Sequence, residues 1–78
     1  MSRQDPQTVE VGDQFKDNDR DQAGRVVEVI AIVGDRAQVV VVKSGQYRWS
    51  VGRRTWVSLE RLQYGRGRQT GYTKVSRR

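Results

Sequence analysis

Two runs rich in valine and isoleucine lie almost next to each other in the chain. They span residues 25–33 and 37–43, and Gly34-Asp35-Arg36 separates them. β-Branched side chains favour strands, and a short link that contains glycine favours antiparallel pairing, so the two runs predict a β-hairpin. Each run is apolar on both faces, which is typical of central strands in a tightly curled barrel or of a sheet face that a partner covers.

Shorter patterns on both sides of this hairpin predict the rest of the sheet. Four further stretches have strand composition: 9–15, 46–51, 54–59 and 71–75. The middle two flank Gly52-Arg53, and glycine at the first loop position favours a type II′ hairpin turn, which places Trp49 opposite Trp56. Leu59 and Leu62 are three residues apart, which fits a short 3₁₀ turn before the last strand.

The chain has 78 residues, enough for one small domain with a thin core. With 46–51 and 54–59 counted together as one hairpin unit, five short strands without an amphipathic helix predict an all-β fold, a small five-stranded SH3-like barrel; an OB-fold is the alternative but is usually longer. We expect a disordered leader over residues 1–8, the barrel over 9–75 and a basic tail over 76–78.

The amino-acid composition excludes several kinds of catalytic and metal-binding site. Cysteine and histidine are both absent, so disulfides, thiolate metal sites and histidine general bases are excluded. The serines have no histidine to activate them, and no glycine-rich phosphate loop leads from a strand into a helix. We therefore expect a protein that is not an enzyme and has no cofactor and no metal.

No apolar run approaches the roughly 20 residues of a membrane span, and the polar N-terminus is unlike a signal peptide, so we expect a cytoplasmic protein without membrane contact.

Charge is distributed unevenly along the chain. Residues 1–22 carry three basic and six acidic side chains, a net charge of −3, whereas residues 23–78 carry twelve and three, a net charge of +9. The basic part is expected to attract a polyanion, either a nucleic acid (DNA or RNA) or an acidic protein. Twelve of the fifteen basic residues are arginine, which suits bidentate contacts to phosphate but equally fits a GC-rich genome.

Cations alternate with flat rings in the stretch 47–56. Arginines can contact phosphates there while aromatic faces stack on unpaired bases. A second, shorter basic segment follows at Gly65-Arg66-Gly67-Arg68. The predicted nucleic-acid-binding residues are the arginines and tryptophans of the first stretch and the two arginines of the second: Arg48, Arg53, Arg54, Arg66, Arg68, Trp49 and Trp56. The competing interpretation, which we favour for the two tryptophans, is a cross-strand pair in the core of the barrel.

The acidic loop resembles part of a calcium-binding loop. Asp17, Asp19 and Asp21 alternate, and Glu28 stands at the twelfth position, as in an EF-hand. However, Gln22 occupies the position that needs glycine, and a strand follows where a helix should begin. A solvated loop is the better interpretation, and its acids could also pair with the basic half of the chain.

Several short motifs support a resemblance to known proteins. Val11-Gly12-Asp13, Asp17-Asn18-Asp19-Arg20, Gly24-Arg25, Val51-Gly52-Arg53-Arg54-Thr55, Leu59-Glu60-Arg61-Leu62 and Gly71-Tyr72 together resemble a group of short proteins of actinobacteria and their bacteriophages whose function is not established. The Gly24–Val29 strand followed by Gly34-Asp35 is more loosely similar to KOW-type SH3-like barrels of transcription and translation factors. That second resemblance implies nucleic-acid binding as one option.

Two function classes follow from these features. The first is a module that binds nucleic acid mainly electrostatically and with weak sequence selectivity, because no recognition helix is available to read the major groove. The second is a protein-interaction module, such as a phage or accessory factor that docks on an acidic host protein. The sequence does not fix the oligomeric state.

Overall fold

The structure, a computed structural model, describes residues 7–19, 24–44, 51–65 and 71–77. These residues form β1 (Asp13–Asp17), β2 (Val26–Val33), β3 (Arg36–Lys43), β4 (Arg54–Ser58), α1 (Leu59–Gln63) and β5 (Tyr72–Arg77). The strands pair antiparallel in one sheet with the order β4-β3-β2-β1-β5. The predicted all-β class with five strands is therefore confirmed.

The hairpin predicted from the two valine-rich runs is formed by β2 and β3. Val29 lies opposite Val39, and Val33 lies opposite Arg36, so the turn consists of Gly34 and Asp35 alone. Gly34 has a φ of +59°, the left-handed value that the first position of a tight hairpin turn requires. Both strands are central in the sheet, as their apolar faces indicated.

The structure pairs β4 with β3, and the partner strand predicted for β4 over 46–51 lies almost entirely outside the described residues. Arg54–Ser58 pairs with β3, so that Trp56 lies opposite Gln38, and Val51 belongs to a turn with Gly52 instead of a strand. Residues 46–50, including Trp49, lie outside the described residues. The long strand β3, rich in β-branched valines, provides the surface against which β4 aligns.

The first and last strands are displaced toward the C-terminus relative to the prediction. β1 begins at Asp13 because a turn precedes it, in which the Asp13 carboxylate accepts a bond of 2.8 Å from the Glu10 amide and Gly12 has a φ of +98°. β5 extends to Arg77, opposite Asp13, so most of the expected basic tail belongs to a strand.

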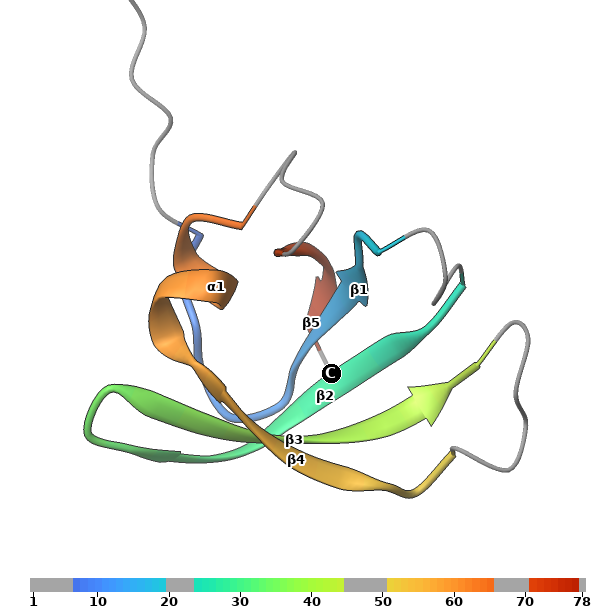
Figure 1. Ribbon diagram of the computed structural model, residues 1–78, viewed down its shortest axis with the longest axis horizontal. Helices are drawn as coiled ribbons and strands as arrows, with labels where there is room; N and C mark the ends of the chain where they lie inside the picture. The colour runs from blue at the N-terminus through green and yellow to red at the C-terminus, as the bar shows by residue number, and fades with distance from the viewer. Residues whose placement is uncertain (1–6, 20–23, 45–50, 66–70, 78) are drawn as a thin grey trace, which may run out of the picture.

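The sheet is open and strongly twisted (Figure 1). β4 and β5 are its two edges, and α1 contacts both of them, which fills the gap between the edges with a helix instead of hydrogen bonds. A short helical segment is present where a 3₁₀ turn was expected, but the predicted helix type is wrong. Leu59–Gln63 is α-helical, capped by Ser58, and the Tyr64 amide donates to the Glu60 carbonyl at 2.8 Å.

The core lies on the concave face of the sheet, beneath α1. Its buried apolar residues are Phe15, Val27, Val29, Ala37, Val39, Val41, Val57, Leu62 and Tyr72. Most are small, so the core is thin, as the length of the chain implies. Burial raises the pKa of the Tyr72 phenol above its usual value, and the carboxylate of Asp17 acts in the same direction; Tyr72 is therefore a neutral core residue.

Gln7 joins the N-terminal end of the described chain to the last strand. Its buried side chain donates to the carbonyls of Leu62 (2.8 Å) and Tyr72 (3.0 Å) and accepts from the Lys74 amide (2.9 Å). This residue falls within the leader expected over 1–8, whose first six residues lie outside the described ones. The Gln7 backbone amide also donates to the Gln63 carbonyl at 2.7 Å, so hydrogen bonds fix a segment that has no strand or helix pattern.

Candidate nucleic-acid interface

The convex face of β3 and β4 carries exposed basic and aromatic side chains. Alternation along each strand directs Ala37, Val39 and Val57 into the core, so their neighbours point outward. The outward group is Arg36, Gln38 and Val40 of β3 with Arg54 and Trp56 of β4. This set is called the Trp56 surface below.

Trp56 is the largest exposed side chain of this surface. It retains 47% of its accessible area, although burial of an indole contributes more than burial of almost any other side chain. The interpretation of Trp56 as half of a core pair is therefore wrong. The cause is the alternation of side chains along β4. Trp56 and Arg54 point to the outer face of the sheet, whereas Val57 points into the core.

Hydrogen bonds hold both ends of β4 against the hairpin. At the start, the Val41 amide donates to the Arg53 carbonyl at 2.9 Å and the Gly52 amide donates to the Val41 carbonyl at 2.7 Å. At the end, the Leu59 amide donates to the Asp35 carbonyl at 2.8 Å. A strand fixed at both ends presents its side chains with little loss of backbone entropy on binding.

The predicted binding residues are only partly brought together. Arg54 and Trp56 share one face of β4, and Arg53 is exposed between the Val51-Gly52 turn and the strand. The other four predicted residues lie outside the described residues: Arg48, Trp49, Arg66 and Arg68. The described part of the predicted site is therefore a cluster of two arginines and one indole at the beginning of an edge strand.

Arg36 is a member of the surface that the sequence did not predict. It is exposed and lies opposite Ser58, which places it diagonally next to Trp56 at about 7–8 Å between Cα atoms. Arg54 flanks the indole on its other side, two residues along β4 and therefore about 7 Å away. The correct β3–β4 pairing was the missing information, because Arg36 is eighteen residues from Arg54 in the chain.

The two aspartates of β1 lie in ion pairs on the far side of the sheet from β4. Asp17 is 4% exposed and forms an ion pair with Arg25, while Asp13 is fully buried and lies 3.2 Å from the Lys74 ammonium. Two acids of the N-terminal third thus pair with the basic part of the chain, one of the possibilities raised above. Glu28 also lies on the convex face, where it accepts from the Gln14 amide at 3.1 Å.

The suggested solvated acidic loop is wrong for Asp17. This residue is the last of β1 and is buried, and one of its oxygens accepts from the Asp19 amide at 3.0 Å. Glu28 stands in the middle of β2, away from any loop, and Asp21 lies outside the described residues. In the part of the chain that the structure describes, no three histidine, cysteine, aspartate or glutamate side chains form a group that could hold a metal ion.

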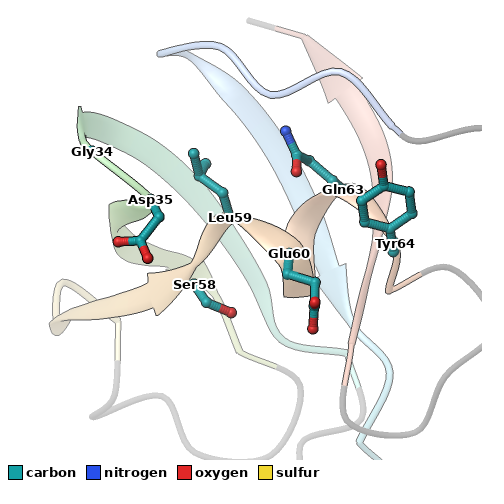
Figure 2. Close-up of a pocket in the computed structure, with 7 residues that line it drawn as sticks. All are labelled: Gly34, Asp35, Ser58, Leu59, Glu60, Gln63 and Tyr64. Carbon is teal, nitrogen blue, oxygen red and sulfur yellow. The ribbon is translucent and has the colours of Figure 1, made fainter.

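A depression of about 570 Å³ lies between the β2–β3 turn and α1 (Figure 2). Asp35 and Glu60 contribute two carboxylates to its lining, and no basic residue lines it. Its side chains do not converge on one point, since Glu60 and Tyr64 extend in different directions in Figure 2. The two carboxylates of this depression disfavour phosphate, so it differs in chemistry from the Trp56 surface, although its Asp35 and Ser58 adjoin Arg36.

Among the described residues there is no helix of sufficient length and hydropathy to cross a membrane. No protein-family model matches the chain, and no curated protein or solved structure is significantly similar to it. The resemblances expected from the sequence therefore stay predictions, and the chain is characterised by its own fold and by the Trp56 surface.

Proposed function

We propose that this chain is a small nucleic-acid-binding module, without catalytic activity, that uses the Trp56 surface and the adjoining Arg53. The observation that carries the proposal is the exposed indole of Trp56 on the same face as Arg54. Arginine can contact phosphate through two parallel hydrogen bonds, and an indole offers a flat face to a base. An exposed indole beside an arginine is therefore better explained by a ligand that has bases and phosphates than by a surface that contacts only water.

Binding is mainly electrostatic and weakly sequence-selective in this proposal. The formal net charge of +6 favours association with a polyanion. α1 has only five residues and its Leu62 is buried under the sheet, so it offers no exposed helix of the length that major-groove readers use. The expected dissociation constant at physiological salt is on the order of 10⁻⁴–10⁻⁶ M.

The SH3-like barrel expected from the sequence is part of this proposal. Five short antiparallel strands support it, together with α1 between β4 and β5, where it contacts both edges of the sheet. The proposed actinobacterial and bacteriophage resemblance and the cytoplasmic location are expectations that accompany it.

The first test is the salt dependence of binding. One phosphate contact from each of the five arginines predicted from the sequence (Arg48, Arg53, Arg54, Arg66 and Arg68) gives a slope of log affinity against log salt of roughly −4 to −5 on duplex DNA. Replacing Arg53 and Arg54 together by alanine removes two contacts, so the slope should flatten by about two units while the fold is retained. Fluorescence anisotropy of labelled DNA and RNA, measured at several salt concentrations, gives both slopes. No binding by the unaltered protein at low salt would refute the function, and an unchanged slope in the double variant would refute the site.

Docking on an acidic protein is the second candidate function. It is favoured by the exposed apolar tip of the β2–β3 hairpin, where Ile32 and Val33 retain 38% and 64% of their accessible area. Gel filtration of fresh lysate with and without nuclease separates the two candidates. Nucleic acid that elutes with the protein and is lost after nuclease treatment supports the first, whereas a nuclease-resistant complex with an acidic protein supports the second.

A further inference from the structure

The arrangement of side chains on the Trp56 surface also bears on which form of nucleic acid it fits. Trp56 stands on an edge strand, at the border of the sheet, and faces outward across from Gln38. Gln38 and Val40, its neighbours on β3, are half-buried and shorter than an indole. Trp56 retains 47% of its accessible area, so part of the ring is accessible to a flat ligand.

Cations lie on two sides of this ring. Arg54 lies along the strand and Arg36 lies diagonally across the β3–β4 pair, both exposed, each about 7–8 Å from Trp56 between Cα atoms. A base placed against the indole therefore lies between two exposed arginines, on the sides where the phosphates that precede and follow that base would lie. A ligand that uses all three groups must offer a free base face and two flanking phosphates.

Only an unpaired strand offers these features together. In a duplex both faces of each base are covered by its neighbours, and exposing one costs a few kcal/mol of unstacking. Stacking of an unpaired base on an aromatic side chain, in contrast, contributes about 1–3 kcal/mol without regard to sequence.

We infer that the Trp56 surface binds single-stranded nucleic acid in preference to duplex, by stacking one unpaired base on Trp56 between Arg36 and Arg54. The inference rests on the proposed function and specifies its ligand. This preference for a single strand is the opposite of the preference that charge alone would produce. Duplex DNA carries one charge per about 1.7 Å and a purely electrostatic surface binds it more tightly than a single strand.

The test compares a labelled 15-nucleotide mixed-sequence single strand with the duplex of the same sequence. Affinities are measured by fluorescence anisotropy at one low salt concentration for the unaltered protein, Trp56→Ala, Trp56→Phe and Val75→Ala. Val75 is 49% exposed on β5, so it is the matched apolar control at the opposite edge of the sheet. Circular dichroism and thermal unfolding check that each variant is folded.

We expect the unaltered protein to bind the single strand more tightly than the duplex. Trp56→Ala should weaken single-strand binding about tenfold, within the range of one stacked base, and change duplex binding less than about twofold. Trp56→Phe keeps a flat ring and should retain most of the affinity, and Val75→Ala should bind like the unaltered protein.

The outcomes separate the two proposals. Tighter binding of duplex, or an equal loss on both ligands in Trp56→Ala, overturns the single-strand inference and leaves nucleic-acid binding intact. Failure of the unaltered protein to bind either ligand overturns the proposed function itself.

Discussion

The two edges of the sheet use charged residues in opposite ways. At the β1–β5 edge, Asp13 and Asp17 are buried and paired with Lys74 and Arg25. At the β3–β4 edge, Arg36 and Arg54 are exposed beside Trp56. Charges at the first edge hold strands together, whereas charges at the second face solvent and a proposed ligand.

This difference shows that charge counted along the sequence is not charge presented at the surface. The net charge of −3 over residues 1–22 suggests an acidic region next to a basic one. Because two of those acids are buried in ion pairs, they neutralise Arg25 and Lys74 and leave Arg36 and Arg54 to act on a ligand.

Breaking an ion pair at the β1–β5 edge should have the largest effect on stability. Asp17→Ala leaves Arg25 without its carboxylate and should reduce the free energy of unfolding by about 3 kcal/mol, the low end for a buried pair, since part of Arg25 reaches solvent. Arg54→Ala should change it by no more than about 0.5 kcal/mol. Urea unfolding of both variants measures the contrast. Similar losses in the two variants would contradict the assigned difference between the edges.

Removing a single cation from the Trp56 surface should have a smaller effect, confined to binding. Arg36→Ala should flatten the salt slope on a single strand by about 0.7, the contribution of one phosphate contact. Lys16→Ala is the matched control, because Lys16 is exposed on β1 and should leave the slope unchanged. The same anisotropy titration serves both variants, and a larger effect of Lys16 than of Arg36 would move the binding site to the other edge.

The sequence predicted the parts of the fold that depend on local patterns. The β2–β3 hairpin follows from two β-branched runs around Gly34-Asp35. It depends on residues close together in the chain, which is why it is confirmed.

Long-range contacts account for the parts that the sequence did not predict. Gln7 bonds to residues 55 and 65 positions later, and its neighbours have no strand or helix periodicity. The pairing of β4 with β3 depends on which long strand is nearby, so the exposure of Trp56 and the role of Arg36 were not accessible from local pattern. Asn18 is similar, since its amide side chain donates to the Gly65 carbonyl at 2.9 Å.

Mapping the contact surface by nuclear magnetic resonance tests the central claim most directly. The ¹⁵N-labelled protein is titrated with a short single-stranded oligonucleotide, and amide and indole N–H shifts are followed. The account predicts the largest changes at the Trp56 indole and at residues 36–43 and 51–58, with β1 and β5 nearly unchanged. The largest changes at Asp13–Asp17 and Tyr72–Arg77, with β3 and β4 unaffected, would contradict it.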